Sequence, residues 1–172
     1  MHILETVPNV RAKVRIRQER PYEYDEARGL WLYRHVDEDE EVFNILTNTG
    51  RVQLHNFAYG TVARANGFNY IGLSNDATPP AAADASLLAE LTSNGLGRAQ
   101  GTVTLPTGAG NQTSILHLFT YTGGAPQGVQ KCALFDSAGP PISGVINHVV
   151  QFVQRTLLLN DTLTVSYTIT LG

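Results

Sequence analysis

The sequence predicts a mainly β protein, a two-sheet antiparallel sandwich of jelly-roll-like form with one or two short helices in its connections. Turn-forming clusters of Gly, Asn, Asp, Ser and Pro recur at short intervals beyond residue 42, which is typical of many short strands. The segment of residues 161–171 alternates apolar side chains with Thr and Ser, as a strand with one buried face does. A length of 172 residues suffices for one hydrophobic core and is short for two.

About nine segments have the character of strands, because each is short, apolar or β-branched in part, and bounded by turn residues. In chain order they are residues 13–17, 30–36, 41–46, 69–73, 98–105, 113–121, 129–136, 146–153 and 161–171. Short strands at this spacing favour a sandwich, and the jelly roll is the form that we expect.

Two connections have helical character instead. Residues 47–67 can form a helix that is capped by Thr47, Asn48 or Thr49 and closed by Asn66 and Gly67. Its apolar face would consist of Val52, Leu54, Phe57 and Ala58. In residues 84–92, Asp84 or Ser86 can cap a turn or two of helix that carries Leu87, Leu88 and Leu91.

Charge divides the chain into two parts. Residues 1–41 contain 7 of the 12 Lys and Arg and 10 of the 15 Asp and Glu, whereas residues 42–172 are nearly neutral. We therefore expect a charged N-terminal arm or strand segment, residues 1–41, followed by a β-sandwich domain, residues 42–172. An arm predicts that a chain without residues 1–20 stays folded but attaches more weakly to its target, whereas unfolding would indicate a core strand.

The basic residues of this segment are candidate contact residues. From Lys13 to Arg17 they alternate with Val14 and Ile16, so a strand would carry all the charges on one face. Such a strip can dock on an acidic surface or on nucleic acid, or it can be a solvated face balanced by the nearby acidic runs. The candidate contacts with a capsid or a neighbouring subunit are Arg11, Lys13, Arg15, Arg17, Arg20 and Trp31.

Trp31 is a candidate for a different reason. It lies among Leu30, Leu32 and Tyr33, which favours a core position or a subunit contact. A carbohydrate-binding groove formed together with Tyr33 and Tyr22 is the alternative.

No pattern of catalytic or ligand-binding residues stands out. The five histidines occur singly, and the sequence has no P-loop, Rossmann glycine pattern or nucleophile elbow. Cys132 is expected to be a buried, inert thiol, and the acidic run at residues 37–41 lacks the ligand spacing of a calcium-binding loop. The aspartates of the body mostly lie in turns, where a short acceptor serves the backbone. We therefore expect no enzyme activity, no catalytic residues, no cofactor and no metal.

Composition also limits the partners. The net charge of −3 and the isoelectric point near 5.9 give no overall positive field, so we expect neither nucleic-acid nor membrane binding. No apolar run approaches eighteen residues and no signal-like segment is seen, which predicts a soluble protein made in the cytoplasm without export. A body rich in Thr, Ser, Asn and Gly can pack against another subunit with little charge to desolvate, which favours assembly over chemistry.

Four segments of the body occur in a recognisable order. They are "FNILTNTGRVQLHNF", "NYIGLSNDATPPAAADASLLAELTSNGLGRAQGTVT", "GVQKCALFDSAG" and "LNDTLTVSYTITLG". Their distinctive features are an N-x-x-T-x-x-G-R helix start, a Y-I-G-L-S strand, an L-x-x-E-L-T-S-x-G-L-x-R loop, an A-L-F-D strand and a final D-T-L-x-V-x-Y-T-I strand. This order resembles a group of small virion proteins of tailed bacteriophages, over residues 43–172.

The resemblance implies a jelly-roll-like head decoration (cement) protein, a homotrimer on the outer surface of the capsid that holds neighbouring major capsid subunits together. Its partners would be the major capsid protein and other copies of itself. Because the same motifs recur in tail-associated proteins, a tail-fibre or baseplate component with a receptor- or glycan-binding role is the alternative. A small glycan-degrading activity on the virion is the candidate from the enzyme class.

Overall fold

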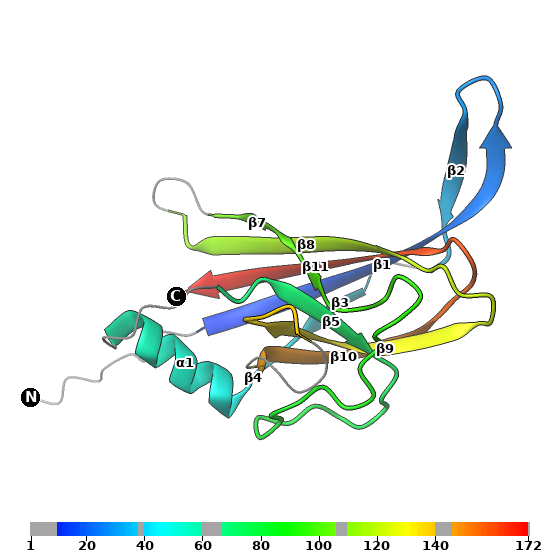
Figure 1. The fold of residues 1–172 in the computed structure, drawn as a ribbon. Coiled ribbons are helices and arrows are strands. Elements are labelled where there is room, and N and C mark those ends of the chain that lie inside the picture. Colours follow the sequence, from blue (N-terminus) through cyan, green and yellow to red (C-terminus); the bar gives the residue numbers. More distant parts are fainter. Residues whose placement is uncertain (1–9, 38–39, 60–66, 106–109, 140–145, 172) are drawn as a thin grey trace, which may run out of the picture.

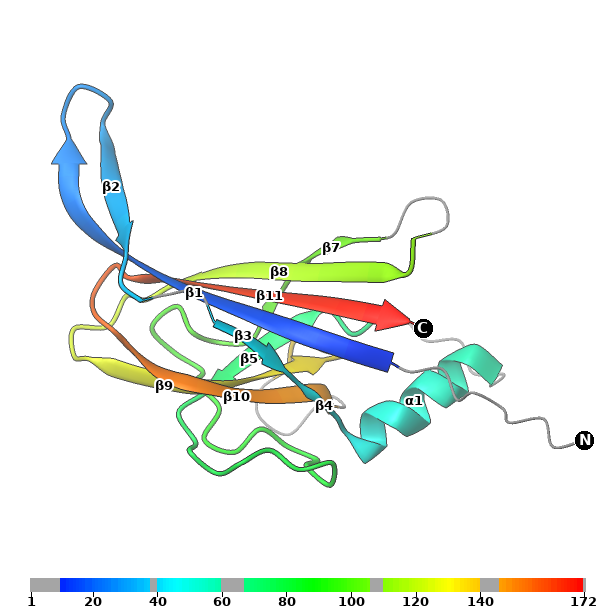
Figure 2. The same cartoon turned by 180° about the vertical axis from the view of Figure 1, so that it is seen from behind.

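The computed structural model describes residues 10–37, 40–59, 67–105, 110–139 and 146–171. In these residues eleven strands form two antiparallel sheets that pack face to face, and one helix lies at one end of the sandwich (Figure 1; Figure 2). The expected fold class, a two-sheet antiparallel sandwich with a short helical connection, is confirmed.

Sheet A has the strand order β2-β1-β11-β8-β7, with β3 also beside β1, and sheet B has the order β4-β10-β9-β5-β6. The elements are β1 (Val10–Asp25), β2 (Leu30–His35), β3 (Glu40–Phe43), β4 (Ile45–Leu46), α1 (Asn48–Tyr59), β5 (Tyr70–Ser74), β6 (Ala99–Gln100), β7 (Thr102–Thr104), β8 (Gln112–Thr120), β9 (Gln127–Phe135), β10 (Ile146–Leu157) and β11 (Thr162–Leu171).

Two of the expected strands are each divided between the two sheets. Residues 41–46 fall in β3 of sheet A and β4 of sheet B, and residues 98–105 fall in β6 of sheet B and β7 of sheet A. At the second crossing, a Cβ on Gly101 would lie 2.7 Å from Ile115 Cγ2, so the bend needs a residue without a side chain. The crossings join the two sheets at opposite edges.

The structure distinguishes between an arm and a strand for the described part of residues 1–41. β1 pairs with β11 from Val10 opposite Leu171 to Glu19 opposite Thr162. The side chains of Val14 and Ile16 have 0% exposure because they point into the space between the sheets. Residues 10–19 are therefore part of a strand of the sandwich rather than an arm.

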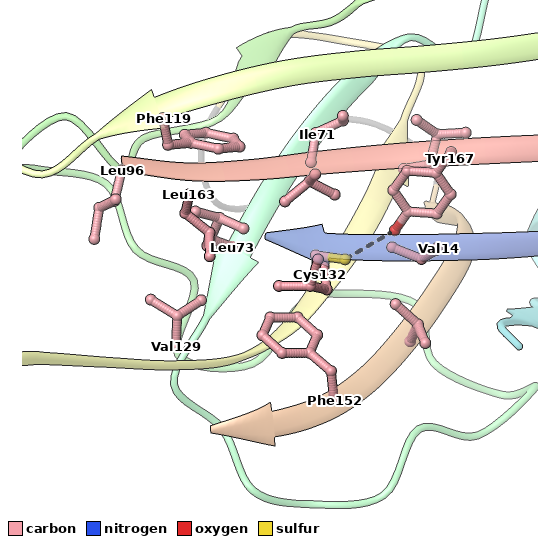
Figure 3. Close-up of a cluster of buried hydrophobic side chains, with 14 of the residues drawn as sticks. Val14, Ile71, Leu73, Leu96, Phe119, Val129, Cys132, Phe152, Leu163 and Tyr167 are labelled. Carbon is pink, nitrogen blue, oxygen red and sulfur yellow. Dashed lines mark hydrogen bonds between the residues drawn. The ribbon is translucent and has the colours of Figure 1, made fainter. Parts of the chain in front are cut away.

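The hydrophobic core lies between the two sheets, and Figure 3 shows one region of it. Phe119 and Tyr167 are among its largest fully buried side chains. Cys132 also lies there, with its Sγ atom 3.3 Å from Tyr167 Oη. Burial raises the pKa of Cys132 to about 12, so the thiol is protonated near neutral pH. The expectation of a buried thiol is confirmed.

The expected helix begins at the expected cap. Thr47 Oγ1 accepts a hydrogen bond of 2.9 Å from Gly50 N, as an N-cap residue does, and α1 runs over Asn48–Tyr59. A Cβ on Gly50 would lie 2.5 Å from Asn147 O, which shows how closely the first turn approaches β10. The predicted closure at Asn66 lies outside the described residues.

The second expected helix, in residues 84–92, is wrong. This segment consists of turns and ends in an isolated bridge between Glu90 and Ser74, and Ala89 has a φ of 49°. Asp84 accepts a hydrogen bond from Ala81 N instead of capping a helix. Its leucines suit a helical face, but the chain instead runs across sheet B, and Leu87 is buried against that sheet.

Gly95 is expected to be the most sensitive glycine of this loop. Its φ is +77°, and a Cβ there would lie 2.0 Å from the carbonyl oxygen of Thr120. Because backbone strain and a backbone clash combine, Gly95→Ala should lower the free energy of unfolding by at least about 2 kcal/mol. Urea unfolding measures the loss. Gly124→Ala is the control, because no atom lies within 4 Å of a Cβ at this exposed position, and it should change stability by less than about 0.5 kcal/mol.

Candidate protein-interaction surfaces

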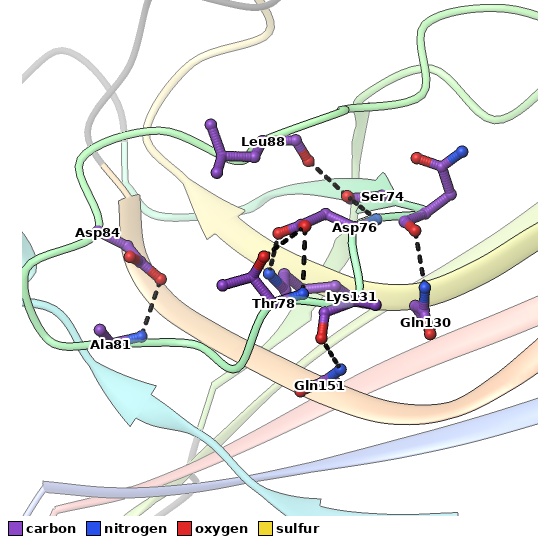
Figure 4. A network of polar contacts seen from close by, with 11 residues as sticks. Ser74, Asp76, Thr78, Ala81, Asp84, Leu88, Gln130, Lys131 and Gln151 are labelled. Atoms are coloured by element: carbon purple, nitrogen blue, oxygen red, sulfur yellow. Dashed lines mark hydrogen bonds and ion pairs between the residues drawn. The ribbon is translucent and has the colours of Figure 1, made fainter.

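The outer face of sheet B is covered by the loop of residues 75–98. Gln130 Nε2 of β9 donates to Asn75 O at 2.7 Å, and Gln151 Nε2 of β10 donates to Ala77 O at 2.8 Å (Figure 4). Lys131 of β9 forms an ion pair with Asp76, and this lowers the pKa of the carboxyl group. The loop of residues 75–98 therefore covers one face of the sandwich.

A buried ion pair fixes the far end of this loop. Arg98 donates from Nε to Glu90 Oε1 at 2.8 Å and from Nη2 to Glu90 Oε2 at 2.7 Å, and both side chains are 1% exposed. The guanidinium carbon of Arg98 also lies 3.5 Å from the centroid of the Phe135 ring. Such a bidentate pair is a structural element rather than a reactive group.

The outer face of sheet A is exposed, in contrast to that of sheet B. Cross-strand partners share a face of a sheet, so Arg15, Ser166, Leu116 and Thr102 form one row across β1, β11, β8 and β7. The flanking rows contain Lys13, Thr168, Ser114 and Thr104 on one side and Arg17, Thr164 and Leu118 on the other. Leu116 and Leu118 are 45% and 50% exposed. We call these residues the outer face of sheet A.

The predicted basic strip is part of this face. The side chains of Lys13 and Arg15 are 53% and 54% exposed, and both lie beside Glu41, with Arg15 Nη2 at 2.6 Å from Glu41 Oε1. Their proximity lowers the pKa of Glu41, mainly through the hydrogen bond from Arg15. Arg17 is half-buried on the same face. Arg11 lies in β1 opposite Thr170, but its side chain is outside the description.

Arg20 does not belong to the strip. It points to the other side of β1 and forms a bidentate hydrogen bond to Asp161, whose side chain is fully buried. Burial alone would raise the pKa of Asp161, but the hydrogen bonds from Arg20, Leu158 N and Gln18 together bring the pKa below its usual value. The charge of Arg20 therefore serves the fold, and its role as a contact residue stays a prediction, with 28% of its side chain exposed.

The second half of β1 and β2 form a hairpin that projects beyond the sandwich (Figure 1; Figure 2). The pairing of β1 with β11 ends at Glu19, whereas the pairing of β1 with β2 continues to Asp25 opposite Leu30. Among the described residues, the hairpin beyond Arg20 has no third strand. A lone two-stranded hairpin is marginally stable in water, which makes this element a candidate contact surface.

The two faces of this hairpin differ in chemistry. Trp31 lies opposite Tyr24 with ring centroids 5.3 Å apart, and Tyr33 follows on the same side of β2. This ring face is 42–52% exposed and, through Glu19 opposite His35, continues the outer face of sheet A. The opposite face carries Glu23, Asp25, Leu30 and Leu32, and also Arg34, which is exposed.

The exposure of Trp31, 52%, contradicts the expectation of a core position. Tyr22, 53% exposed, lies at a bulge where the register shifts between Pro21 and Glu23. Sequence reasoning did not single out three other exposed side chains of these surfaces, Tyr24, Leu116 and Leu118. Leu116 and Leu118 had a usable signal, because β8 is apolar on both faces around His117, a pattern typical of strands that are covered on both sides.

The histidines and carboxylates do not assemble into a reactive group in the part of the chain that the structure describes. In those residues, no three His, Cys, Asp or Glu side chains lie close enough together to hold a metal ion. His117 Nδ1 lies 3.0 Å from Gln100 O. His148 is 1% exposed, and neither of its ring nitrogens has a hydrogen-bond partner among the described residues.

His148 should make the fold sensitive to mild acid. Burial lowers its pKa to about 4, whereas an unfolded chain has a histidine pKa near 6.5. Both states are neutral above pH 6.5. Below pH 6.5 the imidazole of the unfolded chain binds a proton, whereas that of the folded chain stays neutral until about pH 4. The free energy of unfolding therefore falls between pH 6.5 and 4, by about 3 kcal/mol in all. Urea unfolding at pH 7, 5.5 and 4 should show a smaller loss for His148→Phe than for the wild type.

Comparison with known proteins does not assign the chain to a family. No protein-family model matches its sequence, and no curated protein matches it. Within the described residues, no helix combines the length and the apolar character needed to cross a membrane.

Proposed function

We propose that this chain is a structural protein of a tailed-bacteriophage virion that decorates the capsid and bridges neighbouring major capsid subunits. The observation that carries the proposal is the projecting hairpin, with four half-exposed rings at Tyr22, Tyr24, Trp31 and Tyr33. Rings of this kind are enriched where proteins bind each other, and their burial supplies much of the binding energy. The order of motifs in residues 43–172, which resembles that of tailed-bacteriophage virion proteins, is the reason for naming a phage capsid as the target.

Several charged side chains form ion pairs within the molecule, which supports a role in assembly rather than in catalysis. Asp161 is bonded to Arg20, Glu90 to Arg98, and Lys131 to Asp76, and each of these pairs holds parts of the fold together. We therefore propose a protein without enzyme activity. The outer face of sheet A and the ring face of the hairpin present Thr, Ser, aromatic rings, leucines and a few charged groups, which fits contact with protein at modest desolvation cost.

Immunogold electron microscopy of intact virions with an antibody to this chain tests the proposal. Gold over the head is expected, and heads without the protein should lose their genome at lower temperature than decorated heads. Purified Trp31→Ala protein should rebind undecorated heads at least about tenfold more weakly than wild type. Leu88→Ala, at a 60% exposed apolar residue of the loop that covers sheet B, is the matched control and should rebind normally. Heads that neither bind the protein nor gain stability from it would contradict the proposal.

A tail-fibre or baseplate component that binds glycans is the second candidate. The observation that favours it is the exposure of the Trp31 ring beside Tyr24, because sugars stack on exposed aromatic rings. Gold confined to the tail, together with a glycan-array signal that Trp31→Ala abolishes and Leu88→Ala leaves intact, would favour this role over decoration.

A further inference from the structure

The outer edge of β2 has no strand beside it. β2 ends the strand order of sheet A, and among the strands that the structure describes it pairs only with β1 (Figure 2). It has 6 residues, whereas β7, β4 and β6, at the other ends of the two sheets, have 3, 2 and 2. Very short edge strands are one way in which proteins prevent pairing with other chains, and β2 lacks this protection.

The backbone of this edge offers both donors and acceptors. Val36 N donates to Gln18 O at 3.1 Å, so these two residues occupy a hydrogen-bonded position of the ladder between β2 and β1. Backbone groups alternate in direction along an antiparallel strand, so the N–H and C=O groups of Tyr33 and Trp31 point away from β1. No Pro or Gly interrupts residues 30–35. The edge of β2 can therefore accept a further strand.

The other edge of the hairpin, which β1 forms beyond Glu19, is less suited to strand addition. Pro21 has no N–H group, and the register shifts between Pro21 and Glu23. Proline, bulges and charged residues are all features that hinder the pairing of an edge with another chain. A third strand of the hairpin is therefore expected beside β2 rather than beside β1.

We propose that this third strand is β2 of a second copy of the chain, antiparallel to the first and related to it by a two-fold axis at Leu32. An antiparallel edge of this kind is complementary to itself under two-fold symmetry. In this register Trp31 of each copy forms a hydrogen-bonded pair with Tyr33 of the other, and the two Leu32 side chains lie opposite each other. Two marginal hairpins then become one four-stranded sheet, which has enough strands to be stable.

The charges of the hairpin are compatible with this pairing. Residues 19–35 contain the acidic residues Glu19, Glu23, Asp25 and Glu26 and the basic residues Arg20, Arg28 and Arg34, so the signs nearly balance. In the proposed register Arg34 of one copy lies opposite Leu30 of the other, and Asp25 follows Leu30 in the same row. Glu19 and His35, 3.6 Å apart, lie beyond the newly paired residues 30–34. A register centred on Arg34 would instead place two guanidinium groups opposite each other, which is unfavourable.

This inference deepens the proposed function, on which its role in a virion rests. The pairing places Tyr24, Trp31 and Tyr33 of both copies on the same side of one sheet, because a two-fold axis perpendicular to the sheet keeps the two ring faces together. A doubled ring face suits a protein that bridges neighbouring subunits, since two linked surfaces bind more tightly than either alone. A protein that stays monomeric but binds heads would contradict only the pairing, and one that dimerises but does not bind heads would contradict only the proposed function.

Sedimentation velocity of the purified full chain, from about 1 µM to 1 mM, is the first measurement. The wild type is expected to form a dimer. Tyr33→Pro removes an N–H group that points away from β1, so it should weaken dimerisation and leave the hairpin ladder intact. Tyr33→Ala is the matched control, because it also loses the ring but keeps the N–H group, and it should dimerise at least about tenfold more tightly than Tyr33→Pro. Circular dichroism checks that each variant is folded.

Cysteine cross-linking tests the register. Opposite residues in a non-hydrogen-bonded pair have Cα atoms about 4.5 Å apart, a separation that a disulfide can span. Leu32→Cys should therefore give a disulfide-linked dimer when copper phenanthroline oxidises the two thiols. Arg34→Cys is the control on the same strand, because its opposite residue is Leu30, and it should cross-link at least about tenfold more slowly. The native Cys132 is buried.

Three results would each overturn the proposal. The first is a wild type that remains monomeric at the highest concentration. The second is an oligomer, such as a trimer, that Tyr33→Pro leaves unchanged. The third is cross-linking of Arg34→Cys as fast as that of Leu32→Cys, which would show that the two β2 strands are not paired about Leu32.

Discussion

A chain that lacks residues 1–20 is expected to be unfolded at neutral pH. The deletion removes the whole length of β1 that pairs with β11, and with it the buried side chains of Val14 and Ile16. It also removes the partners of Asp161, because Gln18 and Arg20 both donate to this buried carboxylate. The combined loss exceeds the roughly 5–15 kcal/mol by which a typical domain is stable.

Far-UV circular dichroism and the dispersion of amide resonances measure this outcome. Two point variants in β1 measure how much a buried and an exposed side chain contribute to the free energy of unfolding. Ile16→Ala should lower the free energy of unfolding by about 2–4 kcal/mol, because it leaves a cavity in the core. The neighbouring exposed Arg15→Ala should change it by less than about 1 kcal/mol. A truncated chain that melts cooperatively near the wild-type temperature would show that the sandwich does not need β1.

Glu90→Ala should lower the free energy of unfolding by about 3–5 kcal/mol, which is the cost of a buried charge that has lost its partner. Arg98 is 1% exposed and stacks on the Phe135 ring, so it has little freedom to turn toward water. Urea unfolding gives the size of the loss. Because the pair ends the loop that covers sheet B, amide hydrogen exchange should also rise first in residues 75–98.

The double variant Glu90→Leu/Arg98→Met is the matched control. Replacement of both charges by apolar side chains of similar volume is often neutral or even stabilising for a buried pair. It should therefore recover most of the loss seen in Glu90→Ala. A double variant that is as unstable as the single one would show that the loop depends on the shape and hydrogen bonds of Arg98 rather than on charge compensation.

The local features of the fold could be read from the sequence because they depend on neighbouring residues. The alternation in residues 161–171 and in residues 13–17 predicts which side chains point inward, and β11 and β1 have that arrangement. Thr47 was among the predicted caps because its hydroxyl serves an amide only three residues away. The strand breaks at Asn44 and Gly101 were missed, since a change of sheet leaves little trace in a short apolar run.

The candidate surfaces depended on contacts that a sequence does not show. Arg20 lies on the other side of β1 from Lys13 and Arg15, and its partner there, Asp161, is far along the chain. Trp31 has leucine neighbours on both sides, which suits a core, but β1 continues past the end of β11 and takes its partner strand out of the sandwich. Relative strand lengths and long-range pairs are tertiary properties, so composition and spacing mislead at these positions.

The continuity of β1 also has a mechanical meaning. Any force applied to the hairpin is transmitted along one 16-residue strand into the middle of sheet A. The hydrogen bonds of an antiparallel ladder lie perpendicular to the strands, so a pull along β1 loads many of its bonds to β11 simultaneously in shear instead of opening them one by one. A hairpin attached in this way can resist sustained tension without unravelling the sandwich that holds it.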